Sequence, residues 1–328
     1  MPGKTSNEQI IGLLKEKPGF VSGETMAAVL GISRAALWKR ISLLRKSGYN
    51  IEASYARGYR LLTSPDLSVE EIRSAFPVRQ AGLGREVILL DRIDSTNTYA
   101  MELAARGAPE GTVILANEQT GGRGRRGRIW ISPRGKSLYM SVVLRPGISP
   151  RDATILTFLS AVAVATAVST LTSLPVTIKW PNDLMVSGRK LGGILTEMKA
   201  DMDRIFHAVV GIGVNINLER EALPEEIRSI ATSVLAETGK SFRRAPFAVG
   251  ILREMEKQYR TLQEKGRHPL LQEWLSLNST IGRHVEVTAG EGKIAGFAEG
   301  IDDEGMLLLR LPDGALRRIG SGDVTYGS

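Results

Sequence analysis

The chain of 328 residues contains no cysteine. This absence excludes disulfide bonds, catalysis by a thiol and zinc sites built from cysteine ligands. Histidine is also scarce, because the sequence has three, which lie far apart at His207, His268 and His284. No Ser–His pairing is evident around them. The sequence therefore offers none of the usual signs of a side-chain nucleophile.

The sequence also lacks a long uninterrupted apolar segment. Its longest apolar stretch, residues 155–171, would span about 25 Å as a helix, whereas a bilayer core needs ~30 Å. Five hydroxyl residues interrupt it, namely Thr157, Ser160, Thr166, Ser169 and Thr170. We therefore expect a buried core helix here. No apolar signal region stands at the N-terminus, so we expect a cytoplasmic protein with no membrane partner.

Positive charge is present and unevenly distributed. Residues 1–62 carry ten Lys/Arg and four Asp/Glu, whereas the rest of the chain carries 33 Lys/Arg and 31 Asp/Glu. The net charge of +8 therefore belongs mainly to the N-terminal piece. A basic module attached to a nearly neutral body is typical of a protein that binds nucleic acid.

The N-terminal residues predict a winged helix-turn-helix domain over residues 1–64. Capping serines and terminal glycines delimit short helices at 6–16, 23–30 and 34–46, and a hairpin follows with Arg57 near its turn. The outer face of the third helix is small, polar and basic, as entry into the major groove requires. The predicted DNA-binding residues are Ser33, Arg34, Ala35, Trp38, Lys39, Ser42 and Arg57. An ordinary three-helix bundle with a solvated charged face is the alternative.

The rest of the chain predicts two further domains. After a linker at residues 64–66, the segment 65–278 alternates strands and helices. We expect helices at 96–106, 152–171 and 247–265, and strands at 87–90, 112–116, 137–144, 176–180, 191–198 and 206–216. Several strands follow one another directly, so we expect an α+β fold with a mixed sheet. From about residue 280, short strands separated by Gly and Asp turns predict a small all-β barrel over 279–328, with strands at 285–287, 294–299, 306–311 and 315–319.

Three segments of the central region carry candidate chemistry. Residues 121–128 read Gly-Gly-Arg-Gly-Arg-Arg-Gly-Arg, which suits a loop that orders around an anion. Residues 94–97, Asp-Ser-Thr-Asn, either cap a helix or bind a polar ligand at its N-terminus. Residues 179–183, Lys-Trp-Pro-Asn-Asp, precede Lys190, which is either an edge lysine or a fixed cation in a pocket. Pro181 places Asn182 and Asp183 at the end of a strand.

Together these segments closely resemble biotin–protein ligases of the bifunctional bacterial type, which also repress transcription of the biotin operon. The Gly/Arg loop and Lys-Trp-Pro-Asn-Asp, in this order and about 50 residues apart, carry the resemblance. It covers nearly the whole chain. It implies a catalytic domain related to class II aminoacyl-tRNA synthetases and a C-terminal SH3-like barrel.

The resemblance implies a reaction in two steps. Biotin and ATP first form biotinyl-5′-adenylate and pyrophosphate, and a lysine of a biotin carboxyl carrier protein of acetyl-CoA carboxylase then attacks the adenylate. Operator DNA and a second copy of the chain are the other expected partners. Neither step needs a nucleophile from the enzyme, so the site must position reactants and offset charge.

The resemblance also implies a role for each matching residue. Biotin is expected to contact Ser95, Thr96, Asn97, Gln119, Arg123, Gly124, Arg125 and Lys190. The nucleotide is expected to contact Arg128, Trp130, Asn182 and Asn215. Lys190, Arg125 and Asp183 are expected to be catalytic: Lys190 faces the carboxylate–phosphate junction, Arg125 lies in the closing loop, and Asp183 orients the incoming amine. Phosphates and water are expected to hold Mg²⁺, because no cluster of carboxylates offers a metal site.

Three alternatives remain. An arginine/glycine tract can be a disordered RNA-binding segment, although this one lies between predicted strands. A related ligase for lipoate or another acyl acid would share the fold. A biotin-responsive repressor without catalysis would share the domains, although Arg125, Lys190 and Asp183 are intact.

Overall fold

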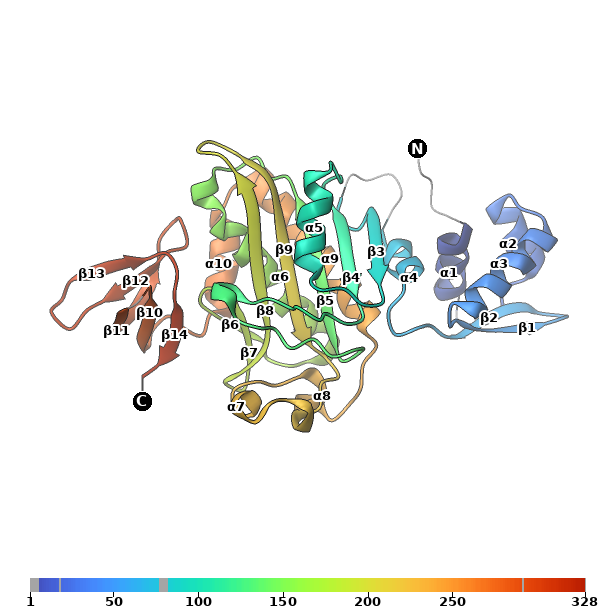
Figure 1. Ribbon diagram of the computed structural model, residues 1–328. Helices are drawn as coiled ribbons and strands as arrows, with labels where there is room; N and C mark the ends of the chain where they lie inside the picture. Colours follow the sequence, from blue (N-terminus) through green and yellow to red (C-terminus); the bar gives the residue numbers. More distant parts are fainter. Residues whose placement is uncertain (1–5, 18, 77–81, 291, 328) are drawn as a thin grey trace.

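The computed structural model describes residues 6–17, 19–76, 82–290 and 292–327. The protein is arranged as three parts in a row, with the largest in the middle (Figure 1). The predicted α+β, multidomain fold class is confirmed. The domain limits at residues 64 and 278 stay a prediction.

The first part is a three-helix unit with a hairpin. It consists of α1 (Ser6–Glu16), α2 (Gly23–Leu30), α3 (Arg34–Lys46), β1 (Asn50–Ser54) and β2 (Gly58–Thr63). Ser33 caps α3, since its hydroxyl accepts a hydrogen bond from the amide of Ala36. Leu37, Ile41 and Leu44 of α3 are buried in the core of this part, so the spacing of apolar residues fixes which side of α3 faces outward.

The central part is built on a mixed sheet of seven strands in the order β3-β4-β5-β9-β8-β7-β6. Strands β3 and β4 are parallel, and the other neighbours are antiparallel. The strands are β3 (Glu86–Leu90), β4 (Thr112–Ala116), β5 (Ser137–Leu144), β6 (Thr177–Lys179), β7 (Asp183–Val186), β8 (Arg189–Ala200) and β9 (Ile205–Asn215). The sequence missed β7, which is separated from β6 by a three-residue turn.

Helices cover both faces of this sheet. Alternate residues of β5 divide between them: Val142 packs with α6 (Thr154–Thr172) and α9 (Arg244–Lys265), whereas Val143 packs with α5 (Thr96–Ala105) on the opposite face. Figure 1 shows α5 on one side of the strands and α6 and α9 on the other. The remaining helices are α4 (Val69–Ser74), α7 (Glu225–Arg228), α8 (Val234–Thr238) and α10 (His268–Leu277).

Helix α6 contains the apolar stretch expected to be a core helix. Within the described residues, the segment Pro150–Thr172 is the one helical stretch long and apolar enough to cross a membrane, and 67% of its apolar 18-residue window is buried. It packs against α9, α10 and the sheet. The prediction of a buried core helix is confirmed.

The C-terminal part is a five-stranded antiparallel sheet in the order β13-β12-β11-β10-β14. Its strands are β10 (His284–Ala289), β11 (Gly292–Ile301), β12 (Leu307–Arg310), β13 (Leu316–Ile319) and β14 (Asp323–Tyr326). The sequence missed β14. Trp180 joins this part to the central one, since its buried indole donates a hydrogen bond to the Gly305 carbonyl.

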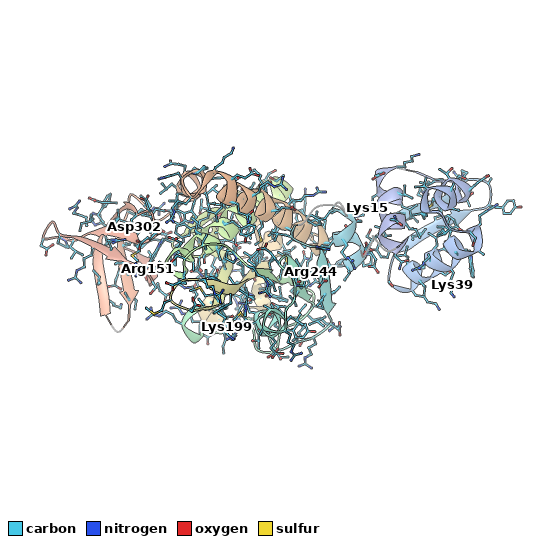
Figure 2. The ribbon with its side chains drawn as sticks, turned by 90° about the horizontal axis from the view of Figure 1, so that it is seen from above. Lys15, Lys39, Arg151, Lys199, Arg244 and Asp302 are labelled. Carbon is cyan, nitrogen blue, oxygen red and sulfur yellow. The ribbon has the colours of Figure 1, made fainter. Side chains whose placement is uncertain are left out.

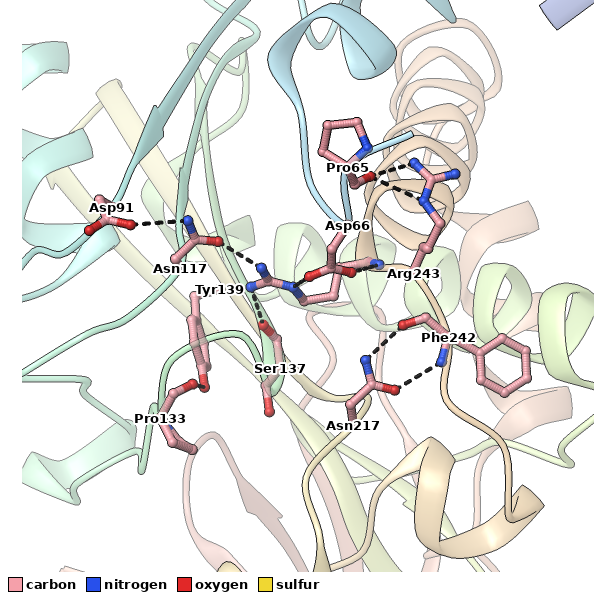
Figure 3. Close-up of polar contacts among 11 residues, drawn as sticks. Pro65, Asp66, Asp91, Asn117, Pro133, Ser137, Tyr139, Asn217, Phe242 and Arg243 are labelled. Carbon is pink, nitrogen blue, oxygen red and sulfur yellow. Dashed lines mark hydrogen bonds and ion pairs between the residues drawn. The ribbon is translucent and has the colours of Figure 1, made fainter. Parts of the chain in front are cut away.

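The buried Arg244 connects the linker after the N-terminal part, at Asp66, to the central sheet. Asp66 accepts a hydrogen bond from the amide of Arg244, the first residue of α9, and pairs with its guanidinium at 2.5 Å. The Arg244 side chain is 3% exposed and also donates to Asn117 and to the Ser137 carbonyl. Figure 3 shows these contacts converging where β4, β5 and α9 meet.

The neighbouring Arg243 connects the linker to the N-terminal part. Its guanidinium donates to the Pro65 carbonyl and pairs with Glu71 of α4. Glu71 in turn pairs with Lys15 of α1 at 2.5 Å. Figure 2 shows Lys15 on the side of the N-terminal part that faces the central part. The orientation of the three-helix unit is therefore held by charged contacts.

Candidate functional site

A pocket of about 240 Å³ lies over β8 and β9, beside the start of α5. It gathers all the residues that the sequence predicted for biotin, nucleotide and catalysis: Ser95, Thr96, Asn97, Gln119, Arg123, Gly124, Arg125, Arg128, Trp130, Asn182, Asp183, Lys190 and Asn215. These residues come from four separate stretches of the sequence, so the fold brings them together.

Hydrogen bonds fix the polar end of the pocket. Ser95 caps α5, and Thr96 donates from both its amide and its hydroxyl to the Gln119 side-chain oxygen, at 2.8 and 3.0 Å. The Ser141 hydroxyl, buried on β5, lies 2.7 Å from the Asn97 oxygen. The capping interpretation of residues 95–97 is therefore correct for Ser95, and the same residues line the pocket.

Strand glycines form the floor of the pocket, which the sequence analysis did not predict. Gly193 of β8 and Gly213 of β9 are directly paired, and Gly211 also lines the pocket. A Cβ atom on Gly213 would lie 2.7 Å from the Trp130 ring. Glycine inside a strand is a signal of close approach, and here it lets the indole lie flat on the sheet.

The Gly/Arg loop is held by both the central and the C-terminal parts. Arg123 pairs with Glu197 of β8 at 3.0 Å, and Arg125 donates to the Asn182 side chain at 2.9 Å. Arg126 donates to the carbonyls of Thr288 and Gly290 in the C-terminal part. Arg128 pairs with Asp323 of β14 at 2.7 Å, and Asp323 also lines the pocket. The sequence analysis did not foresee this contribution of the C-terminal part.

Lys190 and Asp183 form the central ion pair of the pocket. Lys190 is the second residue of β8, and its ammonium lies 2.6 Å from the Asp183 carboxylate and 5.7 Å from the centre of the Trp130 ring. Asp183 begins β7, so it lies at a strand terminus, although the strand is one that the sequence missed. Lys190 is therefore the fixed cation in a pocket.

The pocket also holds a partly buried arginine and an indole N–H without a partner. Burial lowers the pKa of Arg125, while Asp323 and Asp183 act in the opposite direction. The indole N–H of Trp130 is buried and has no hydrogen-bond partner. It is therefore a donor available to a ligand.

An apolar wall closes the pocket on the side of the segment after β9. It consists of Leu218, Leu223, Ile227, Ile230 and Ala231. The side chain of Asn217, next to Leu218 of this wall, makes two hydrogen bonds to the main chain of Phe242. Its oxygen accepts from the Phe242 amide at 2.9 Å, and its nitrogen donates to the Phe242 carbonyl at 2.7 Å. The sequence analysis missed this wall because its short helices lack a clear apolar period.

The predicted DNA-binding residues lie on α3, at its N-terminal cap and in the hairpin turn of the N-terminal part. Arg34, Ala35, Trp38 and Lys39 are exposed on α3, and Trp38 is 61% exposed although it is aromatic. Ser33 and Ser42 stand on the same helix, but both are used locally, Ser33 as the cap and Ser42 in a bond to the Trp38 carbonyl. Arg57 lies in the hairpin turn, 4.0 Å from the centre of the Phe20 ring.

Comparison with known sequences finds a matching family for each of the three parts of the chain. Residues 7–60 match the helix-turn-helix (HTH) domain family, residues 89–215 the biotin/lipoate A/B protein ligase family, and residues 280–326 the biotin protein ligase C-terminal domain. The chain is 41% identical to the bifunctional ligase/repressor BirA of Bacillus subtilis over 94% of both chains. It belongs to the biotin protein ligase family.

Other relatives agree with this assignment to the biotin protein ligases. The bifunctional ligase/repressor BirA of Escherichia coli is 33% identical, again over 94% of both chains. The solved biotin protein ligase of Aquifex aeolicus, in complex with biotin and ATP, is similar with a TM-score of 0.63 at 30% identity. It covers 74% of this chain, and this chain covers 98% of it. The family resemblance inferred from the sequence is confirmed.

Proposed function

We propose that this biotin protein ligase activates biotin with ATP and transfers it to a lysine of a biotin carboxyl carrier protein. A carboxylate oxygen of biotin attacks the α-phosphorus of ATP, and the bond to the β-phosphate bridge breaks, which releases pyrophosphate. The neutral amine of the carrier lysine then attacks the carbonyl of the mixed anhydride. An amide forms, AMP leaves, and the amine releases a proton.

The ion pair of Lys190 with Asp183 carries this proposal. A lysine held at 2.6 Å by a carboxylate in a partly buried pocket is a fixed positive charge. During adenylation, Lys190 stabilises the charge that builds up between the carboxylate and the α-phosphate. During transfer, Asp183 accepts a hydrogen bond from the incoming amine and orients it.

The remaining pocket residues divide between the two ligands. Thr96 and Gln119, which line the pocket beside the glycine floor, are proposed to hydrogen-bond the ureido head of biotin. Trp130, with its free indole N–H, and Asn215 are assigned to the nucleotide, next to the apolar wall at 218–231. Arg125 closes over the anhydride and keeps water away from it.

ATP enters this scheme as its Mg²⁺ complex. Within the described residues no group of three or more histidine or carboxylate side chains could hold a metal ion. The two aspartates of the pocket, Asp183 and Asp323, are both engaged by cations. Phosphate oxygens and water are therefore the proposed ligands of Mg²⁺.

The N-terminal part is proposed to bind operator DNA and to repress transcription as part of a homodimer. The support is the exposed face of α3 and the match to bifunctional ligase/repressors. Two copies of α3 related by a two-fold axis would read two half-sites. Biotinyl-adenylate would favour the dimer by ordering the loop at 121–128.

Mass spectrometry of the protein after incubation with the acid and MgATP tests the reaction. We expect retained biotinyl-adenylate with biotin, and biotin attached to a carrier domain when one is added. Lipoate and octanoate are the controls. Activation of lipoate and not of biotin would identify the protein as a lipoate ligase. If no acid formed an adenylate, the protein would be a repressor without catalytic activity.

A further inference from the structure

One cation beside the pocket has no role in the scheme above. Lys179 is the last residue of β6, and it stands directly opposite Asp183 in the β6–β7 pair. Directly paired residues of antiparallel strands project from the same face of a sheet. Lys179 therefore lies on the same side of the sheet as the central ion pair, at the border between the central and C-terminal parts.

Lys179 makes no ion pair within the described residues. Asp183, its cross-strand neighbour, gives its carboxylate to Lys190. The ammonium of Lys179 lies 5.1 Å from the centre of the Tyr326 ring in β14. Burial lowers the pKa of Lys179, attraction to Asp183 and Asp323 works against this, and repulsion from Lys190 and Arg128 adds to it. A partly desolvated cation without an anionic partner is unfavourable unless a ligand supplies the anion.

The surroundings of Lys179 carry an excess of positive charge. The two carboxylates that line the pocket, Asp183 and Asp323, are each paired with an arginine or lysine. Lys179 and Arg125 make no ion pair within the described residues, although Arg125 donates a hydrogen bond to Asn182, and burial lowers the pKa of both cations. Two cations without a paired carboxylate suit a ligand with several negative charges.

We propose that Lys179 binds the β- and γ-phosphates of ATP and then the pyrophosphate that leaves. This inference rests on the proposed function. Lys190 meets the α-phosphate, where the carboxylate attacks, and the leaving group departs on the side opposite to the attack. Lys179 supplies a cation on that departing side, which completes the charge compensation along the triphosphate.

This assignment makes different predictions for the two half-reactions. Pyrophosphate takes part in adenylation and is absent from the transfer of biotin from the finished adenylate. Replacing Lys179 should therefore affect adenylation alone, whereas replacing Lys190, which faces the carboxylate–phosphate junction, should affect both. A purely structural role for Lys179 against Tyr326 would disturb both half-reactions together.

The experiment compares Lys179→Met with Lys179→Arg in the full chain. A charge-assisted hydrogen bond contributes about 1.5–3 kcal/mol, which corresponds to roughly 10- to 150-fold in binding. We expect Lys179→Met to raise the KM for MgATP and the inhibition constant of added pyrophosphate by at least tenfold, with the KM for biotin unchanged. In Lys179→Arg, which keeps the positive charge, the KM for MgATP and the inhibition constant of pyrophosphate should be close to those of the unmodified protein. Lys293→Met, in an exposed pair with Glu286, is the matched control.

Transfer from synthetic biotinyl-5′-adenylate to a carrier domain is the second measurement, and Lys179→Met should leave its rate unchanged. Unchanged constants for ATP and pyrophosphate in Lys179→Met would overturn the inference. An equal loss in the transfer step would also overturn it, in favour of a structural contact with Tyr326. Failure of the unmodified protein to release pyrophosphate with biotin would instead refute the proposed function.

Discussion

Replacement of Lys190 by alanine should slow adenylation far more than it weakens the binding of biotin. The Lys190 ammonium is bound to Asp183 at 2.6 Å, and the two side chains are 34% and 25% exposed. The charge is therefore partly shielded from water and already positioned before any ligand arrives. An interaction that strengthens as charge develops appears in the chemical step and not in ground-state affinity.

The size of the effect follows from this geometry. Loss of one preorganised donor to a developing negative charge typically costs about 100- to 1,000-fold in rate. In Lys190→Ala the Asp183 carboxylate also stays behind unpaired, beside the reacting anions. We therefore expect a loss of about 1,000-fold in the rate of adenylation and less than about tenfold in biotin affinity.

The assay is single-turnover formation of biotinyl-adenylate, measured beside the dissociation constant of biotin. The double variant Lys190→Ala/Asp183→Asn separates the two causes, because it removes the unpaired carboxylate as well. Its adenylation rate should exceed that of Lys190→Ala alone by roughly tenfold, a difference of about 1.4 kcal/mol in activation free energy.

Two results would refute this reasoning. Equal losses in affinity and in rate would mean that Lys190 binds ground-state biotin only. A double variant no faster than Lys190→Ala would mean that the unpaired Asp183 carboxylate has no effect on the reaction.

Further predictions concern the loop, the floor and the domains. Arg125→Gly should still form the adenylate but release it, so its half-life on the enzyme should fall at least tenfold and a non-cognate protein should become biotinylated; an unchanged half-life with no stray labelling would contradict the role of Arg125 as a lid residue. Gly213→Val should displace the Trp130 ring, which a Cβ would approach to 2.7 Å, and should raise the KM for ATP at least tenfold with little change in thermal stability; an unchanged KM would show that the ring does not bind nucleotide. Deletion of residues 1–64 should abolish DNA binding and leave adenylation, and loss of both activities would show that the contacts of the N-terminal part with α4, such as Lys15 with Glu71, are required for the pocket. Biotinyl-adenylate should increase homodimerisation in sedimentation and strengthen operator binding in footprinting, and identical self-association with and without it would refute the coupling.

The long elements could be predicted from the sequence because their patterns are strong. The strands at 112–116 and 137–144 have the predicted limits, and α6 lies within one residue of its apolar stretch. Short elements were predicted in part: β6, β12 and β13 were expected, whereas β7 and β14 were missed. β7 has four residues directly after a proline turn, and its strand character comes from pairing with β6 and β8 rather than from its own pattern.

The candidate site was predictable where a motif carried it and not where tertiary packing created it. Lys190 and Asp183 belong to recognisable segments, so their meeting in one pocket was expected. Asp323 lies in a strand that the sequence missed, and it reaches the pocket only because the C-terminal part packs against the loop at 121–128. The glycine floor needed the register of β8 and β9, since Gly193 and Gly213 are far apart in the chain.

The position of α6 has a consequence for synthesis on the ribosome. Its apolar surface is covered partly by α9, which begins at Arg244, long after α6 ends at Thr172. At roughly 5–20 residues per second, the chain between these helices takes about 4–15 s to emerge. During that interval the nascent chain presents a segment as apolar as a membrane helix with its final cover not yet made. The part of the α6 surface that α9 covers is therefore exposed in the nascent chain until α9 has been synthesised.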